Sequence, residues 1–221
     1  MTETRNPRPN LLADEDLPAE PHQKRSLEKR ARLKSAGLAL FGEKGYENTS
    51  IQEIATRADL AVGGFYLHYR SKRQLLLALM DELLDRFTRL DLRPTEFADI
   101  RAGLRGFLLR AFATDLQYLG AWRAFQEAAF SDADLARKQI EIQAWTTMRV
   151  TAFFTMLQQL RGARPRVDIP GLARAMDSFF WNFLAQAVHM PEPELDRWID
   201  AATHLIYHAL FVDSAGDPPS S

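Results

Sequence analysis

The apolar residues of this chain recur at the spacing of helices, and no segment of useful length alternates between apolar and polar residues as a half-buried strand does. In the first such run, Leu33, Ala36, Gly37, Leu40 and Phe41 fall on one helix face. Helices of this kind bury their apolar faces against one another. The sequence therefore predicts an all-α fold.

Caps and breakers divide this pattern into successive helices. Gly42 and Gly45 are expected to end the first helix, and Ser50 followed by Glu53 is a capping box that opens a short second one. A short aromatic segment follows at 61–69, and Ser71 with Gln74 opens a long helix. Further helices are expected over 96–118, 122–130, 131–160, 168–190 and 194–212.

This order predicts two domains between polar tails. Residues 23–70 are expected to form an N-terminal three-helix helix-turn-helix domain, and residues 71–212 are expected to form a C-terminal helical bundle. Residues 1–22 and 213–221 are polar and are expected to be disordered.

Composition excludes several classes of protein. The chain contains no cysteine, which removes disulfide scaffolds, thiolate metal sites and cysteine nucleophiles. It has no uninterrupted apolar run of about 20 residues and no apolar core of a secretory signal at its start, so we expect a cytoplasmic protein.

Charge is unevenly distributed along the chain. Residues 22–73 hold eleven Lys or Arg against five Asp or Glu, a net charge of +6, which leaves -7 for the remainder of a chain whose total is -1. A concentrated basic segment is typical of a surface that meets a phosphate backbone. A solvated charged face would explain the charge alone equally well.

The segment Ser50 to His68 has the layout of a helix-turn-helix, with a supporting helix, a tight turn and a second helix that enters the major groove. Gly63 and Gly64 leave the first turn of that second helix bare, so its backbone amides can approach phosphates closely. Tyr66 and His68 offer donors just beyond. In the alternative reading the glycines only form a turn and His68 is an ordinary surface residue.

These residues resemble the TetR family of bacterial regulators over about residues 28 to 80. The matching positions, in order and spacing, are Leu33 to Phe41, Lys44-Gly45-Tyr46, Thr49-Ser50-Ile51, Ile54-Ala55, Gly63, Phe65-Tyr66, His68-Tyr69 and Ser71-Lys72. The resemblance implies that Val62, Gly64 and the neighbouring helix start face bases, and that Thr49, Tyr66, His68 and Lys72 hold phosphates.

Two positions depart from the family pattern. Ala61 stands where Ser often caps the recognition helix, and Gly64 stands where Thr is common. Two hydroxyl contacts are thereby missing, and base readout rests chiefly on Val62, with Arg57 or the basic arm 24–32 as further candidates. The expected DNA-binding residues are Thr49, Arg57, Val62, Gly63, Gly64, Tyr66, His68 and Lys72.

The C-terminal helices are expected to form a dimer interface and a sensor pocket. The apolar character of 172–188 and 195–210 indicates burial, by a partner or by the chain's own core, and the expected interface residues are Phe179, Phe180, Leu184, Trp198, Leu205 and Ile206. The expected ligand-binding residues are Phe112, Trp122, Phe125, Gln126, Trp145, Met148, Arg149 and Phe183, although aromatic residues at this spacing are more often plain core. Arg149 is a candidate partner for an anionic group.

The sequence favours a regulator over an enzyme. It contains no nucleophile elbow, phosphate loop or paired-carboxylate signature, so we expect no catalytic residues and no cofactor. His204 and His208 have the i, i+4 spacing of metal ligands but lack a third ligand in sequence, and we expect no metal.

Three functions remain open at this stage. One is a repressor that binds a palindromic operator as a homodimer and is released by a small apolar or amphipathic effector. Another is a DNA-binding regulator without such an effector, controlled by a protein partner or by abundance. The third is an enzyme or transport accessory that uses a helical bundle. No membrane partner is expected.

Overall fold

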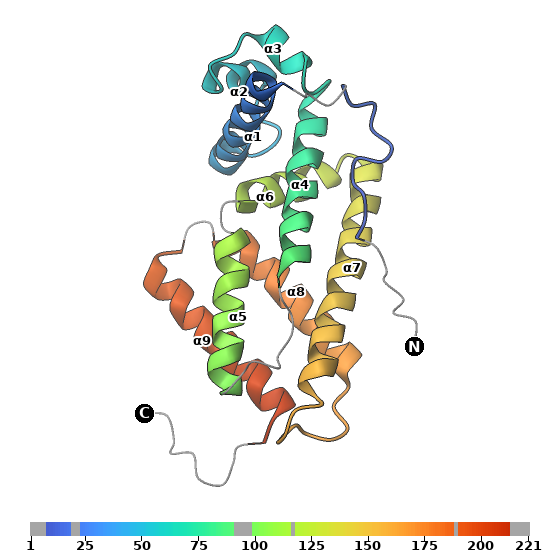
Figure 1. The fold of residues 1–221 in the computed structure, drawn as a ribbon, viewed down its shortest axis with the longest axis vertical. Helices are drawn as coiled ribbons and strands as arrows, with labels where there is room; N and C mark the ends of the chain where they lie inside the picture. Colours follow the sequence, from blue (N-terminus) through green and yellow to red (C-terminus); the bar gives the residue numbers. More distant parts are fainter. Residues whose placement is uncertain (1–7, 19–22, 91–98, 116–117, 188–189, 213–221) are drawn as a thin grey trace. The chain divides into compact units, whose positions relative to one another are not determined.

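The computed structural model describes residues 8–18, 23–90, 99–115, 118–187 and 190–212. Over these ranges the backbone is helical (Figure 1), with α1 (Lys24–Lys44), α2 (Ile51–Arg57), α3 (Val62–Tyr66), α4 (Lys72–Arg89), α5 (Ile100–Asp115), α6 (Leu119–Ala129), α7 (Ala133–Leu157), α8 (Ile169–Ala187) and α9 (Glu192–Leu210). The same ranges contain no strand beyond an isolated bridge between Ala163 and Phe211. The predicted all-α fold is confirmed.

Contacts along the backbone divide the chain into two compact units. The N-terminal unit comprises Met1–Arg89 and Asp115–Ile142, and the C-terminal unit comprises Leu90–Thr114 and Gln143–Ser221. A domain boundary between residues 70 and 71 is expected from the sequence, whereas α4 packs with the helices that precede it. Leu75 and Leu79 of α4 lie against Gly37 of α1, which shows why α4 is part of the same core.

Helix α1 forms where the sequence analysis expects it. Leu33, Ala36, Gly37, Leu40 and Phe41 are buried, as their common helix face predicts. The helix ends at Gly45, whose φ of 80° lies in the left-handed region and whose N–H donates to the carbonyl of Phe41 at 3.0 Å.

Gly42 does not end α1 as expected, because it lies inside the helix where α1 crosses α6. A Cβ atom built on Gly120 of α6 would lie 2.5 Å from Cα and 2.6 Å from the backbone nitrogen of Gly42. A Cβ atom on Gly42 would make only an ordinary contact with Gly120 at 3.6 Å, so it is Gly120 whose lack of a side chain permits the close approach of the two helices.

Residues 8–18, here called the N-terminal strap, differ from the disordered tail expected of them. The Arg8 guanidinium donates to both carboxylate oxygens of Asp81 on α4, at 2.7 and 3.0 Å, and its Nε lies 2.8 Å from Asp85. Leu11 is fully buried, and its N–H donates to Asp81 at 3.3 Å. Paired carboxylates on α4 thus anchor a strap whose apolar residue completes the core beneath it.

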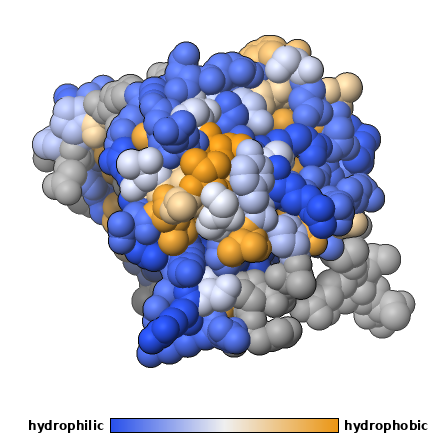
Figure 2. Space-filling view, turned by 90° about the horizontal axis from the view of Figure 1, so that it is seen from above, coloured by the Kyte–Doolittle hydropathy of each residue, from blue (hydrophilic) through white to orange (hydrophobic). Residues whose placement is uncertain are grey.

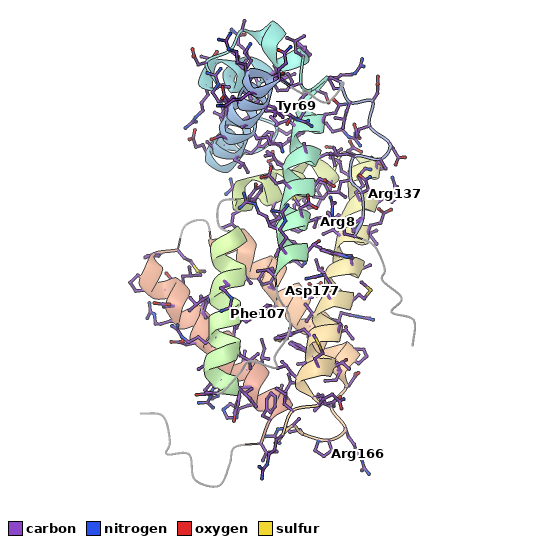
Figure 3. All side chains as sticks on the ribbon, in the orientation of Figure 1. Arg8, Tyr69, Phe107, Arg137, Arg166 and Asp177 are labelled. Carbon is purple, nitrogen blue, oxygen red and sulfur yellow. The ribbon has the colours of Figure 1, made fainter. Side chains whose placement is uncertain are left out.

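The second half of the strap reaches the start of α7. Glu15 pairs with Arg73 of α4, which also donates to Asp132 at 2.9 Å and pairs with Asp134. Asp14 lies 3.8 Å from the buried ammonium of Lys138. The labels of Arg8 and Arg137 in Figure 3 mark this side of the N-terminal unit. The strap therefore joins α4 to α7 through charged groups.

The C-terminal unit is built around aromatic side chains. Phe183 stacks on Trp198 of α9 with ring centroids 4.0 Å apart, and Phe179 lies 4.8 Å from the same indole. Phe107 of α5, labelled in Figure 3, lies 4.7 Å from Phe153 of α7. In the parts of the chain described, no helix is long and apolar enough to cross a membrane.

Candidate nucleic-acid interface

The supporting helix α2 begins with the predicted capping box. The Ser50 hydroxyl accepts from the Glu53 N–H at 3.2 Å, and the Glu53 carboxylate accepts from the Ser50 N–H at 2.9 Å. Lys44 pairs with the same carboxylate, and together with Ser50 it lowers the pKa of Glu53 to about 2. The start of α2 is therefore fixed by local hydrogen bonds and one charge.

A tight turn links α2 to the short helix α3. Asp59 has a φ of 53°, and the Leu60 N–H donates to the Ala55 carbonyl at 2.9 Å. The capping residue of α3, Ala61, makes no side-chain hydrogen bond, as its lack of a hydroxyl requires. The backbone amides at the start of α3 thus have no side-chain oxygen in front of them.

Side chains of α3 divide into a buried and an exposed set. Phe65 and the following Tyr69 are buried, with ring centroids 5.9 Å apart, and they hold the segment against the core. Val62 and Tyr66 are 39% and 50% exposed. Seen from above in Figure 2, the surface is largely hydrophilic, with apolar residues gathered near its middle.

The two glycines of α3 have no evident packing role. Neither has a positive φ, and a Cβ atom on Gly63 would meet nothing within 4 Å. A Cβ atom on Gly64 would make only an ordinary contact with Leu60, at 3.5 Å. Glycine costs about 1 kcal/mol relative to alanine inside a helix. Its presence here is therefore not explained by the fold of this unit.

Two of the expected phosphate-binding side chains face inward. The Thr49 side chain is buried, and its hydroxyl lies 2.7 Å from the Gly45 carbonyl and 3.3 Å from that of Leu40. His68 is buried, and burial together with Arg30 and Lys29 lowers the pKa of its imidazole, which favours the neutral form. Both side chains brace the turns around α2 and α3.

The expected cations Lys72 and Arg57 already have partners. Lys72 lies over the Tyr46 ring at 4.1 Å, and its ammonium donates to the Tyr46 carbonyl at 2.6 Å. Burial lowers the pKa of this lysine. Arg57 forms an exposed pair with Glu43 at 2.6 Å, an arrangement that a stronger anion can displace.

Other cations of the basic segment form no ion pair with the residues that the structure describes. Lys24, Arg25 and Lys29 lie exposed on the first turns of α1, and none forms an ion pair with another residue that the structure describes. By contrast, Lys34, Lys44 and Arg73 are all paired with carboxylates. Three cations without an ion pair to a described residue therefore lie together at the start of α1.

Sequence reasoning missed the part that Glu127 plays. This α6 carboxylate accepts from the N–H groups of Tyr46 at 2.8 Å and Glu47 at 3.2 Å. It thereby holds the turn between α1 and α2 from outside the helix-turn-helix. No local signal points to it, because the residues that it binds lie about 80 positions earlier in the chain.

The expected ligand-binding residues fall into two groups. Trp122, Phe125 and Gln126 lie on α6 in the N-terminal unit, where the two rings stack at 5.9 Å. The C-terminal unit contains the others, namely Trp145, Met148 and Arg149 on α7 and Phe183 on α8. The Arg149 guanidinium lies 5.2 Å from the Trp145 ring centroid. The side chain of Phe112 lies outside the described residues.

The expected interface residues are likewise divided. Three of them pack within the chain itself, because Phe179 and Trp198 contact each other and Ile206 is buried. Phe180 is half-buried beside Trp181, with ring centroids 5.8 Å apart. Leu205 is 51% exposed. The side chain of Leu184 lies outside the described residues.

The histidine pair on α9 has the geometry that its spacing predicts. The ring centroids of His204 and His208 lie 4.2 Å apart, and the Nε2 atom of His208 lies 3.0 Å from Nη2 of Arg101. A cation beside His208 disfavours a metal ion there. The residues that the structure describes include no group of three or more histidine or acidic side chains able to hold a metal.

Residues 33–79, which span all of α2 and α3, match the model of the bacterial regulatory proteins of the tetR family. The chain therefore carries the N-terminal domain of the TetR family. Curated relatives match over a similar length of the chain. The Bacillus subtilis regulator YuxN, described as an uncharacterized HTH-type transcriptional regulator, is 41% identical over 64 residues, which are 28% of this chain and 22% of that protein.

A named repressor also matches part of this chain. The HTH-type transcriptional repressor KstR of Mycobacterium tuberculosis is 32% identical over 88 residues, which are 40% of this chain and 37% of KstR. The matches thus span less than two fifths of these relatives. Beyond the domain the likeness is one of fold. The solved SmeT–triclosan complex superposes with a TM-score of 0.65 at 21% identity, covering 87% of this chain and 96% of that one.

Proposed function

We propose that this chain is a DNA-binding transcriptional regulator, a repressor that binds a palindromic operator as a homodimer and is released by a small, largely apolar ligand. The observation that carries the proposal is the bare face of α3, where Gly63 and Gly64 serve no packing purpose. A surface that must meet the edges of base pairs accounts for them, because every added side chain would keep the backbone from the duplex.

Each exposed group near α3 has a role in this proposal. Val62 and the two glycines face base edges, and Tyr66 donates to a phosphate from the end of the helix. Lys24, Arg25 and Lys29 supply the free positive charge that attracts the phosphate backbone. Arg57 joins them by exchanging Glu43 for a phosphate. Thr49 and His68 stabilise the turns around α2 and α3 in this proposal and do not bind phosphates.

Lys72 has a different part from the free cations. Its contacts with Tyr46 hold the start of α4, and one hydrogen of its ammonium is used by the carbonyl. The other two hydrogens are available to a phosphate. We expect Lys72 to couple the turn after α1 to the DNA backbone.

A homodimer accounts for the exposed leucine of α9. We propose that Leu205 lies at the centre of the interface, with the half-buried Phe180 toward its edge. The side chains of Phe179, Trp198 and Ile206 would then pack beneath the interface and support it. Two copies are needed because half-sites of a palindrome lie about 34 Å apart on one face of the duplex.

Ligand response is supported by what relatives are said to bind. SmeT is described in complex with triclosan, a small molecule, and KstR is described as a repressor. The aromatic residues of α7 and α8 suit a largely apolar molecule. The alternative, a regulator controlled by a protein partner or by abundance, predicts that no small molecule changes DNA binding.

Selection from a pool of random duplexes tests DNA binding directly. We expect one palindromic sequence to be enriched, with an affinity that falls steeply as salt rises. Gly63→Leu should weaken operator binding at least about tenfold, because the added side chain stands where the duplex approaches. Its melting temperature should match that of the wild type, since nothing lies within 4 Å of the new Cβ atom.

Gly106→Ala serves as a matched control, because it adds a methyl group next to the flexible Arg110 side chain of α5. It should leave operator binding unchanged. A pool from which no sequence is enriched, or a Gly63→Leu variant with full affinity, would remove the support for this interface.

A further inference from the structure

A buried carboxyl group lies between α7 and α8 in the C-terminal unit. Asp177 of α8 is 5% exposed, and the hydroxyls of Thr147 and Thr146 lie 2.7 and 3.1 Å from its Oδ2 atom. Trp181, one turn further along α8, donates from its indole nitrogen to the Thr146 hydroxyl at 3.2 Å. Figure 3 labels Asp177 inside this bundle of helices.

The described groups that hydrogen-bond to this carboxyl are neutral. In the part of the chain that the structure describes, no lysine, arginine or histidine forms an ion pair with Asp177. Burial raises its pKa, and the threonine hydroxyls and the Trp181 indole only partly oppose that effect. The carboxyl therefore occupies an interior position without the countercharge that buried acids normally have.

A purely structural tie between α7 and α8 does not explain an acid at this position. Asparagine has nearly the same shape, accepts the same hydroxyl donors and carries no charge to bury. An ionisable group kept in the interior at this cost is typical of a functional site. A cation that is present only part of the time would explain why the chain itself provides none.

We propose that Asp177 is the anchor for a protonated amine on an otherwise apolar ligand that binds between α7 and α8. The charge-assisted hydrogen bond from the ammonium to the carboxylate supplies the missing partner. The indole of Trp181, on the same side of α8, offers a ring face that attracts cations. This inference rests on the proposed ligand response and names the chemistry of the effector.

The structure also contains a position that would select the opposite charge. Arg149 of α7 is half-buried over the Trp145 ring, where it would attract a carboxylate. The sign of the preferred ligand charge therefore distinguishes Asp177 from Arg149 as the anchor.

Matched probes test the inference on the whole protein by titration calorimetry. Decylamine, decanol and decanoate share one chain, and 1-adamantanamine, 1-adamantanol and 1-adamantanecarboxylate share a compact cage, so only the polar group varies within a series. In at least one series we expect the amine to bind about tenfold more tightly than both the alcohol and the carboxylate. Absence of an amine preference in both series, including absence of binding by either amine, would overturn the inference.

Asp177→Asn identifies the group responsible for the preference. The amine should bind this variant no better than the alcohol, while the melting temperature should equal or exceed that of the wild type, because a buried charge has been removed. Asp196→Asn, the same change on the exposed surface of α9, should leave the preference intact. An amine preference that survives Asp177→Asn would refute the assignment even where the wild type shows it.

Operator release is measured separately with the same probes. An amine that binds through Asp177 but leaves DNA binding unchanged would support the anchor and contradict the proposed ligand response. Release of the operator by the alcohols or carboxylates, without an amine preference, would support the proposed ligand response and contradict the anchor at Asp177.

Discussion

The crossing of α1 and α6 makes a quantitative prediction about stability. In Gly120→Ala the new methyl carbon would lie 2.5 Å from Cα and 2.6 Å from N of Gly42, and 3.1 Å from the carbonyl oxygen of Leu38. Carbon atoms in favourable contact are about 3.5 to 4.0 Å apart, so the helices must separate by about 1 Å. The obstructing atoms belong to the backbone, which cannot rotate away as a side chain would.

Overpacking of this kind costs about 1 to 3 kcal/mol, and a rigid backbone neighbour favours the upper end. Replacing glycine by alanine within a helix returns about 1 kcal/mol. We therefore expect Gly120→Ala to lower the free energy of unfolding by about 2 kcal/mol. The reciprocal variant Gly42→Ala is the control, because its methyl carbon would lie 3.6 Å from Gly120 Cα, which is an ordinary contact.

Urea unfolding followed by circular dichroism, together with amide exchange of α1 and α6, measures both variants. The loss should appear in Gly120→Ala alone, as a lower midpoint with an unchanged slope and as weaker protection in those two helices. Equal stability of the two alanine variants would show that the backbones are not in contact at this crossing.

Three further predictions concern other parts of the chain. Leu11→Ala should lower the free energy of unfolding by about 2 to 5 kcal/mol, since it leaves a cavity at a fully buried position. Limited proteolysis should then cut this variant within residues 8–18, and should cut Leu12→Ala less. NMR titration should give Glu53 a pKa of about 2. Because this pKa is lowered in the folded state, the contribution of Glu53 to stability should be present above about pH 4.5 and lost as the pH falls toward 2. Lys44→Ala should raise the pKa of Glu53. Leu205→Glu should leave the fold intact, because the residue is exposed in the single chain, and should shift the protein from dimer to monomer in sedimentation; a wild-type monomer would end the dimer proposal.

Local signals were enough to predict the helix-turn-helix. The Ser50 and Glu53 capping box and the Gly45 helix end depend on residues within a few positions of one another, so spacing alone reveals them. The same reasoning assigned Thr49 and His68 to phosphates. It could not show that both side chains turn inward, because the direction of a side chain depends on packing against α1 and its neighbours.

Features that depend on distant residues could not be predicted from spacing. The strap looked disordered because its stretch of the sequence is polar, acidic and dotted with prolines, and the carboxylates that bind Arg8 lie more than 70 positions later. Asp177 was overlooked for a similar reason, since nothing in the sequence around it indicates that two threonines of α7 surround it.

The strap also has a consequence for the order in which the protein matures. Its residues are synthesised before Asp81 and Lys138, which they contact and which lie much later in the chain. At about 5 to 20 residues per second, the interval between the synthesis of Asp14 and of Lys138 is roughly 6 to 25 s. The helix-turn-helix is synthesised well within that time, whereas Leu11 stays exposed to water until the residues that cover it have been made. The strap is thus synthesised before the helix-turn-helix but docks after it, and a nascent chain exposes a leucine that the folded chain buries.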